Sequence, residues 1–226
     1  MLIQSVTPER EIIINKDYRR LKRVLDIIFT LLILLPLCLV IAILAVLIKL
    51  DSKGSVFFRQ KRVGQNGVEF DMLKMRSMYE NSDETPHRQA IEQYIMNNQQ
   101  LNDDPTTGMK YKQIDDPRVT RIGRFMRKTS LDELPQFFNV LRGEMTLVGP
   151  RPPLPYEVEL YSPRDWLRLS GKPGLTGTWQ VYGRSQVPFQ KMVEMDIAYL
   201  EQQSFWQDLK LIALTLPVMI KGYGGA

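Results

Sequence analysis

The sequence predicts an α+β fold: a mainly helical body with a small β-hairpin, anchored at a membrane by a proline-broken re-entrant helix and by interfacial helices. Three features predict it: an uncharged apolar run at residues 27–48, two β-rich stretches around an Asn-Gly pair, and apolar residues at helical spacing in the remaining chain. The 226 residues suit one domain with an appendage. We divide them into a basic N-terminal segment (1–23), the membrane helix (24–50) and a cytoplasmic domain (51–226) with an interfacial C-terminal helix.

The apolar run at 27–48 is long enough to enter a membrane as a helix. It carries no charge, and about 20 apolar residues are enough to cross the hydrocarbon core. Pro36, near its middle, removes a backbone hydrogen bond and bends the helix. The only cysteine, Cys38, lies in this run, where we expect it to be buried.

Both flanks of the run are basic, which favours a re-entrant helix over a spanning one. Lys and Arg prefer the cytoplasmic side of a membrane, so a single span would leave one cluster outside. A helix that is broken at Pro36 and enters and leaves on one face keeps both clusters inside. The buried helix of a soluble protein is the plain alternative. The cations concerned are Arg19, Arg20, Lys22 and Arg23 before the run, and Lys49, Lys53, Arg59, Lys61 and Arg62 after it.

The first part of the body combines a hairpin with a helix. Two β-rich stretches within 55–78 flank Gln65-Asn66-Gly67, and Asn-Gly is a strong signal for a two-residue hairpin turn. Residues 85–100 predict a helix that Thr85 can cap. Residues 102–117 are loop by composition. The apolar face of the helix consists of Ala90, Ile91, Tyr94 and Ile95.

The second part of the body predicts two helices followed by loops. Residues 118–128 suit a short helix whose inward side chains are Val119, Ile122 and Met126. A further helix runs to Arg142 and is ended by Gly143. Residues 149–177 are rich in Pro and Gly and predict ordered loops that cross the surface.

The C-terminal tail predicts one more helix. Ser204 and Gln207 form a capping-box pattern at its start, and Pro217 breaks an apolar run that is too short to span a membrane. Trp206 favours a position at the membrane interface. An ordinary core helix is an equally good interpretation of the same residues.

The composition limits which residue types can carry catalysis or ligand binding. A net charge of +5 indicates an anionic partner: nucleic acid, an anionic membrane or a phosphorylated substrate. One cysteine excludes an internal disulfide, and one histidine leaves little room for a zinc site or a Ser-His-Asp triad. The sequence has neither a P-loop nor a G-x-G-x-x-G motif. Any chemistry therefore rests on carboxylates, lysines and arginines.

The acidic pair Asp132-Glu133 follows the most basic stretch of the chain, residues 118–128, which holds Arg and Lys and no acid. As a structural feature, Ser130 and Glu133 fit a capping box. As a functional feature, guanidinium groups match phosphate oxygens, and nearby cations should lower the pKa of Asp132 and keep it ionised. A carboxylate can accept a phosphoryl group or hold Mg²⁺.

The basic stretch also has two other interpretations. It suits a solvated face or a contact with anionic lipid. Nucleic acid is disfavoured, because the stretch lacks interleaved exposed aromatic residues and the chain is placed at a membrane. A membrane adaptor without catalytic activity and a membrane-tethered nucleic-acid binder are therefore the two rival functions.

The sequence resembles the bacterial sugar transferases, also called monotopic phosphoglycosyl transferases, over nearly the whole chain from about Lys22. Many motifs occur in the order of that family. They are KRVLD (22–26), the apolar run with its proline, SVFFRQKRVGQNG (55–67), FDMLKMRSM (70–78), DPRVTRIGRFMRKTSLDELPQFFNVLRGEMTLVGPRP (116–152), KPGLTGTWQVYGR (172–184), and Asp196, Tyr199 and Asp208 in the tail.

The resemblance implies an activity for the cytoplasmic domain. Such enzymes move a sugar 1-phosphate from a UDP-sugar to a polyprenyl phosphate, usually undecaprenyl phosphate, and release UMP. The step opens the synthesis of a surface polysaccharide, such as exopolysaccharide, capsule or lipopolysaccharide, or of a glycoconjugate. The resemblance also implies a location at the cytoplasmic face of the bacterial inner membrane. The sugar and the oligomeric state stay open, with a homodimer among the alternatives.

The resemblance also implies the site residues. Asp132 matches the family's nucleophile, which forms a covalent phosphosugar intermediate, and Glu133 matches its dyad partner. The family cofactor is Mg²⁺, with Asp132 at its site. Leu35-Pro36 stands where Ser-Pro is often found at the break of the membrane helix. The residues that match phosphate- or nucleotide-binding positions are Lys74, Arg127, Arg151 and Arg184.

Overall fold

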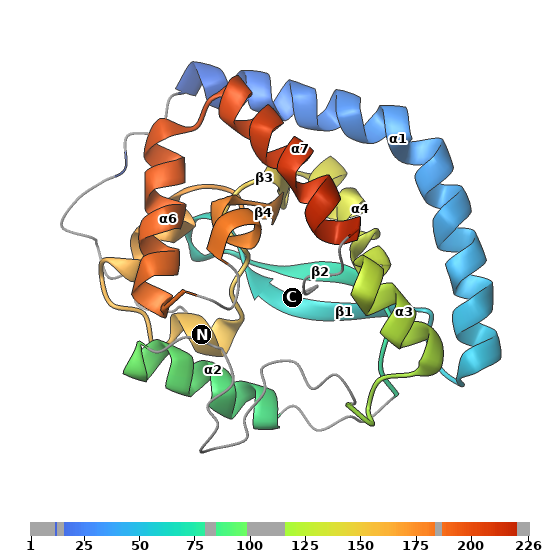
Figure 1. Ribbon diagram of the computed structural model, residues 1–226. Coiled ribbons are helices and arrows are strands. Elements are labelled where there is room, and N and C mark those ends of the chain that lie inside the picture. Colours follow the sequence, from blue (N-terminus) through green and yellow to red (C-terminus); the bar gives the residue numbers. More distant parts are fainter. Residues whose placement is uncertain (1–11, 13–15, 80–84, 99–115, 184–186, 221–226) are drawn as a thin grey trace.

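The computed structural model describes residues 12, 16–79, 85–98, 116–183 and 187–220 (Figure 1). The described part is mostly helical with two small sheets, as the predicted α+β class requires. Its helices and strands are α1 (Lys16–Asp51), β1 (Phe57–Val63), β2 (Glu69–Met75), α2 (Thr85–Asn97), α3 (Arg121–Thr129), α4 (Gln136–Arg142), β3 (Thr146–Val148), α5 (Pro155–Val158), β4 (Gly174–Thr176), α6 (Phe189–Gln202) and α7 (Phe205–Ile220).

Helix α1 contains the whole apolar run, and within the described residues it is the one helix long and apolar enough to cross a membrane. Figure 1 shows it changing direction part-way along and passing around the outside of the body. Only 22% of its apolar window is buried, which is not the state of a core helix in a soluble protein. Leu32 and Leu35 are 75% and 83% exposed. Cys38 is also exposed, so the expectation that it is buried was wrong, because this face of α1 has no protein neighbour.

One stripe of α1 faces the body. Leu37, Ile41, Leu44 and Ile48 are buried, at the spacing of one helical face, and pack around Met126. The opposite face stays apolar and exposed. This two-sided apolar character is what distinguishes α1 from an ordinary amphipathic surface helix.

Polar contacts fix the start of α1 to the rest of the fold. Lys22 forms a buried ion pair with Asp208 of α7. Arg23 donates through Nη2 to the carbonyl oxygen of Leu141 at 2.8 Å, near the end of α4. Asp26 accepts a hydrogen bond of 2.6 Å from Oγ1 of Thr146 in β3. The polar residues of the KRVLD motif thus position the membrane helix.

The predicted hairpin is present. Strands β1 and β2 pair antiparallel from Phe57↔Met75 to Val63↔Glu69. The connection is longer than the predicted two-residue turn, because a 3₁₀ turn over Gln65–Gly67 is inserted between the strands. Asn66 still adopts a φ of 57°, the left-handed conformation that an Asn-Gly pair favours.

Three predicted helices of the body are confirmed. Helix α2 begins at Thr85 and buries Ile91, Tyr94 and Ile95 against α6, although it ends at Asn97. Helix α3 begins at Arg121, and Thr120 caps it by accepting from Gly123 N. Helix α4 ends at Arg142, and Gly143 (φ 82°) is its left-handed cap. Most of the predicted loop at 102–117 lies outside the described residues.

The Pro- and Gly-rich segment 149–177 does not cross the surface as predicted. It lies in the core and contains α5, a 3₁₀ helix (Asp165–Ser170) and strand β4, which pairs parallel with β3. Close backbone contacts make this possible, such as Gly149 N donating to the carbonyl of Thr176 at 2.8 Å. A Cβ on Gly174 would lie 2.1 Å from Gly149 N, so glycine is required for this approach.

The last two helices close the core. Asp196 of α6 is fully buried and forms an ion pair of 2.6 Å with the equally buried Arg168. In α7, Leu211 is buried, as the core interpretation expects, while Trp206 is 75% exposed, and the interfacial interpretation stays a prediction. Only half of the predicted capping box forms: Ser204 Oγ accepts from Gln207 N at 3.4 Å.

Candidate active site around Asp132

The acidic pair lies on a short 3₁₀ turn, Leu131–Glu133, between α3 and α4. Ser130 has φ 56° and ψ 20° and ends α3 in a left-handed conformation, with no capping bond from its side chain. The predicted capping box is therefore wrong, because the chain reverses at Ser130 and does not start a helix there. Pro135 then leads into α4. Asp132 and Glu133 are therefore positioned by the backbone of this turn and belong to neither α3 nor α4.

The turn is held by apolar contacts on both sides of the pair. Leu131 and Leu134 pack into the same cluster as Leu44 of α1 and Met75 of β2. The side chain between them, Asp132, is only 7% exposed. The long apolar helix α1, the hairpin and the acidic turn therefore share one packed core.

Strand β2 supplies a cation to the pair. The Nζ atom of Lys74 lies 3.4 Å from Oε1 of Glu133, and both side chains are partly buried. Since a partly buried pair is less screened by water than a surface pair, this contact orients Glu133 more firmly than an exposed ion pair would.

Burial decides the acidity of Asp132. Burial is the largest cause that raises the pKa of Asp132, the negative charge of Glu133 adds to the rise, and the positive charges of Lys74 and Arg127 offset part of it, so that the pKa of Asp132 is about 6. The expectation that nearby cations lower this pKa was wrong in its net direction, because desolvation of the carboxylate outweighs their attraction. A carboxyl group with such a pKa is a stronger base than an exposed one and is still mostly ionised at neutral pH.

Arg127 lies in the last turn of α3, and its positive charge acts to lower the pKa of both Asp132 and Asp116. Arg118 of the same basic stretch has a different role: its Nη2 lies 2.8 Å from Oδ2 of Asp116 in an ion pair. The sequence analysis counted Arg118 with the other cations, and Asp116, two residues earlier, was the signal that could have separated it.

The two remaining arginines are placed differently. Arg151 lies in the loop after β3, where its guanidinium carbon is 5.6 Å from the centre of the Trp179 ring. Its carbonyl oxygen accepts from Nη2 of the buried Arg168 at 3.1 Å, which fixes the backbone there. Arg184 lies outside the described residues. The structure thus gathers Lys74, Arg127, Asp132 and Glu133, and gives Arg151 an aromatic partner.

The donor set at the turn suits Mg²⁺. Among the described residues, no group of three or more His, Cys, Asp or Glu side chains could hold a metal alone. Mg²⁺ often binds through one or two carboxylates and completes its shell with water and substrate phosphates. Asp132 and Glu133 meet that requirement, and a cation beside them would offset the repulsion that raises the pKa of Asp132.

Comparison with known proteins identifies the family. The family described as "Bacterial sugar transferase" matches residues 17–222. The chain belongs to this family. The resemblance drawn from the motifs is thus confirmed, and so is the enzyme class of sugar transferase at the level of the family.

Several relatives of this sugar transferase have informative names. The galactosyl transferase CpsE of Streptococcus agalactiae serotype III is 44% identical over 204 residues, which cover 90% of this chain and 43% of CpsE. The exopolysaccharide production protein ExoY of Sinorhizobium fredii is 37% identical over 203 residues, which cover 90% of this chain and 87% of ExoY. The UDP-glucose:undecaprenyl-phosphate glucose-1-phosphate transferase of Escherichia coli is 39% identical over 206 residues, which cover 88% of this chain and 40% of the E. coli protein. The chain therefore spans less than half the length of CpsE and the E. coli protein.

Proposed function

We propose that this sugar transferase moves a sugar 1-phosphate from a UDP-sugar to polyprenyl phosphate and releases UMP. The observation that carries the proposal is the buried Asp132-Glu133 turn with Lys74 and Arg127 beside it, in a member of a family whose named relatives include undecaprenyl-phosphate phosphotransferases. The relative ExoY, which is named an exopolysaccharide production protein, connects the step with polysaccharide synthesis.

The reaction proceeds in two displacements at phosphorus. In the first, an oxygen of ionised Asp132 attacks the sugar-bearing phosphorus, the bond from that phosphorus to the bridging oxygen breaks, and UMP leaves with the electron pair. In the second, an oxygen of polyprenyl phosphate attacks the same phosphorus and the bond to Asp132 breaks. The products are polyprenyl diphosphate sugar and the regenerated carboxylate, with no net transfer of a proton.

The cations make the first attack feasible, because it joins an anion to a diphosphate. Arg127 can bind phosphate oxygens through its planar fork, and Lys74 adds a point charge. Glu133 is held by Lys74 and keeps the pKa of Asp132 high, so the nucleophile is more basic than an exposed carboxylate. We assign Arg151 and Arg184 to the phosphate or nucleotide on the strength of the motif alone.

We assign Mg²⁺ to the same carboxylates. Bound there, it would supply positive charge to the phosphate oxygens as charge develops on the leaving UMP. Asp132 and Glu133 are the side chains that would hold it.

We further propose that α1 enters and leaves the membrane on the cytoplasmic face, as a re-entrant helix broken at Pro36. Its exposed apolar face and its two basic ends support this arrangement. A re-entrant helix keeps the acidic turn, which packs against α1, at the membrane surface where a soluble and a lipid substrate can both reach it.

A transfer assay tests the proposal. The full chain in detergent or nanodiscs is incubated with undecaprenyl phosphate, Mg²⁺ and a panel of UDP-sugars carrying a labelled sugar. Label should enter the lipid phase together with UMP release, and Asp132→Asn should abolish both while the protein stays folded. If lipid binding is retained but no sugar of the panel is transferred, the adaptor function is favoured.

A further inference from the structure

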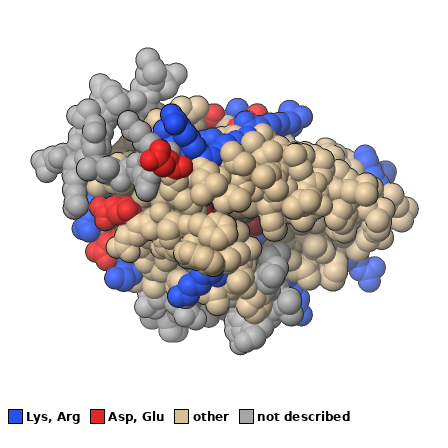
Figure 2. Space-filling view, turned by 90° about the horizontal axis from the view of Figure 1, so that it is seen from above, with Lys and Arg blue, Asp and Glu red and all other residues tan. Residues whose placement is uncertain are grey.

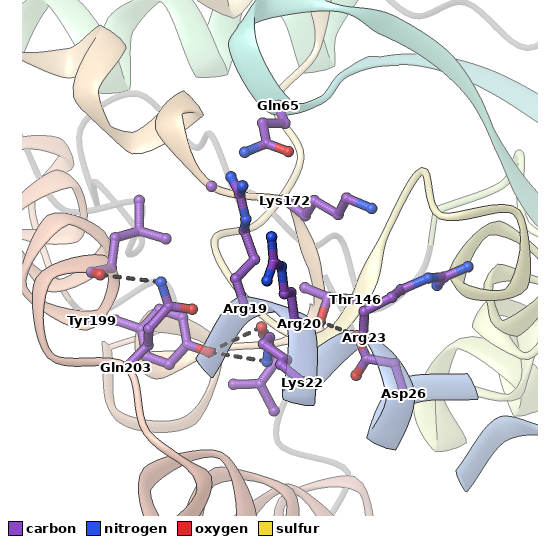
Figure 3. Close-up of a pocket in the computed structure, with 13 residues that line it drawn as sticks. Arg19, Arg20, Lys22, Arg23, Asp26, Gln65, Thr146, Lys172, Tyr199 and Gln203 are labelled. Atoms are coloured by element: carbon purple, nitrogen blue, oxygen red, sulfur yellow. Dashed lines mark hydrogen bonds between the residues drawn. The ribbon is translucent and has the colours of Figure 1, made fainter. Parts of the chain in front are cut away.

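A basic pocket lies apart from the acidic turn. It has a volume of about 510 Å³ and is enclosed by the first turns of α1, the hairpin turn, the loop before β4 and the end of α6 (Figure 3). This size is that of a site for a small molecule or a lipid headgroup. Several quoted motifs contribute to its lining, among them KRVLD (22–26) and the motif that starts at Lys172, but the sequence did not indicate that these distant segments meet.

Positive charge dominates the lining. The cations are Arg19, Arg20, Lys22, Arg23 and Lys172, and among the described residues Asp26 supplies the one carboxylate of the lining. Some of these charges are already neutralised or bound: Lys22 pairs with Asp208, and Arg23 donates to a main-chain carbonyl of α4.

Arg19, Arg20 and Lys172 make no ion pair with any residue that the structure describes. In Figure 3 the side chains of Arg19 and Arg20 extend from α1 toward Gln65, and the side chain of Lys172 lies below Gln65 and points away from Arg19. A methyl group on Gly143 would lie 3.4 Å from Nη2 of Arg23 and 3.5 Å from Nζ of Lys172, so these two cations flank the same glycine. Burial lowers the pKa of Lys172, and Arg23 and Arg19 lower it further, against a smaller opposite effect of Asp26. A bound anion would relieve this crowding.

The apolar surface of α1 begins in the same turns of the helix that line the pocket. On α1, the exposed residues Leu21, Val24 and Ile28 alternate with the cations of the lining. On α7, the exposed Trp206 stands two residues before Asp208, the partner of Lys22. Aromatic and basic residues at the edge of an apolar surface mark the depth of lipid headgroups.

The position of the pocket excludes the reacting phosphates as its occupant. The pocket uses α1 from Arg19 to Asp26, whereas the acidic turn packs against the half of α1 that contains Leu37 to Ile48. An anion in the pocket therefore does not meet Asp132.

We propose that this pocket binds the phosphodiester headgroup of an anionic phospholipid of the surrounding membrane. The guanidinium groups of Arg19 and Arg20 and the ammonium group of Lys172 are each suited to bind phosphate oxygens, and the surplus positive charge of the lining favours an anionic over a zwitterionic headgroup. The bound lipid holds the start of α1 at the membrane surface. The inference rests on the membrane attachment of α1 proposed above and on none of the transferase chemistry.

The test measures lipid binding directly, without substrates. Native mass spectrometry of the full chain in detergent, titrated with phosphatidylglycerol or phosphatidylcholine, should find one phosphatidylglycerol retained per chain. Lys172→Gln should weaken that binding on the order of tenfold, through loss of one charged hydrogen bond. Lys53→Gln removes the same charge at the other end of α1 and should leave it unchanged.

Three results would overturn the proposal: an equal loss in Lys172→Gln and Lys53→Gln, which indicates diffuse attraction; equal retention of phosphatidylcholine; or displacement of phosphatidylglycerol by an equimolar amount of undecaprenyl phosphate, which assigns the pocket to the acceptor lipid. If Lys172→Gln does not fold, Arg19→Gln carries the same test, since Arg19 is exposed. The experiment measures phospholipid binding and not sugar transfer, so a failed transfer assay would not change its interpretation.

Discussion

Asp132 is the residue at which burial and charge oppose each other most directly. Its pKa of about 6 means that the folded protein makes ionisation of this carboxyl group less favourable than in water, while the positive charges of Lys74 and Arg127 limit the rise. As the proposed nucleophile, Asp132 needs a pKa between two extremes. Strong pairing with cations would lower the pKa and make the carboxylate a weak nucleophile, whereas a pKa above neutral would leave it protonated and unable to attack. Two predictions separate the contributions of burial and of charge.

Lys74 should set the acidic limb of the pH–rate profile. Its positive charge lowers the pKa of Asp132, so Lys74→Met should raise that pKa and move the limb to higher pH. We expect activity at pH 6 to fall roughly two- to fivefold more than activity at pH 8. Lys53→Met, at the far end of α1, should leave the limb in place. A limb that stays fixed in Lys74→Met would contradict the role of this charge.

Asp132→Asn should stabilise the fold in the absence of Mg²⁺. Because the folded pKa is raised from 3.8 to about 6, ionised Asp132 destabilises the folded state above pH 6, and this effect disappears below pH 4. At pH 8 the variant should unfold with a free energy on the order of 1–3 kcal/mol higher than wild type, and the gain should shrink at pH 4.5. Thermal melts in EDTA measure it. Asp71→Asn, which breaks only a surface pair with Lys61, should show neither effect.

Arg127 tests geometry instead of charge. Arg127→Lys keeps the positive charge and loses the planar fork, so kcat/KM should fall on the order of tenfold, or about 1.5–3 kcal/mol for a charged hydrogen bond. The acidic limb should not move. Arg121→Lys, an exposed position on the same helix, is the matched control. Near-wild-type rates in Arg127→Lys would argue against a phosphate contact.

At the scale of elements, the sequence predicted those helices and strands that depend on residues close together in the chain. The apolar run in α1, the hairpin around Asn66-Gly67 and the buried faces of α2 and α3 were predicted from composition, turn residues and residue spacing, whereas the stripe of α1 that packs on the body was not. Strands β3 and β4 were missed, because each is short and their pairing depends on contacts between distant glycines, Gly149 and Gly174. The left-handed Ser130 was missed for a similar reason, since Leu131 and Leu134 make that turn favourable only once α1 packs against them.

The proposed break of α1 at Pro36 can be tested by the membrane topology of the two ends of the helix. In a Cys38→Ser background, Asp17→Cys and Lys53→Cys should both be labelled only from the cytoplasm. Adding Pro36→Leu restores a backbone hydrogen bond and should straighten the helix, so that a fraction of the molecules expose Asp17→Cys to the periplasm. Pro217→Ala, in a helix too short to span, is the control. Periplasmic labelling of Asp17→Cys without the Pro36 change would refute the re-entrant arrangement.

At the scale of the whole molecule, α1 joins two charged sites through one apolar surface. Figure 2 shows the face that carries this surface, with a broad uncharged area bordered by Lys and Arg. The basic pocket lies at the start of α1 and the acidic turn packs against its second half. A membrane contact along α1 would thus fix the height of Asp132, so that one nucleophile can serve a soluble donor and a lipid acceptor in turn.

This arrangement predicts two separable half-reactions. With UDP-sugar and Mg²⁺ but no polyprenyl phosphate, the wild type should release up to about one equivalent of UMP and retain a phosphosugar. Peptide mass analysis should find the adduct on Asp132, and initial rates should follow a ping-pong pattern. Asp132→Asn should abolish both the adduct and turnover, because it keeps the shape and removes the anionic nucleophile. Glu133→Gln should slow the first half-reaction severely, since Glu133 helps to keep Asp132 basic. If UMP appears only after polyprenyl phosphate is added and no adduct is trapped, the covalent route is wrong, and Asp132 would then act on the substrates without forming a bond to phosphorus.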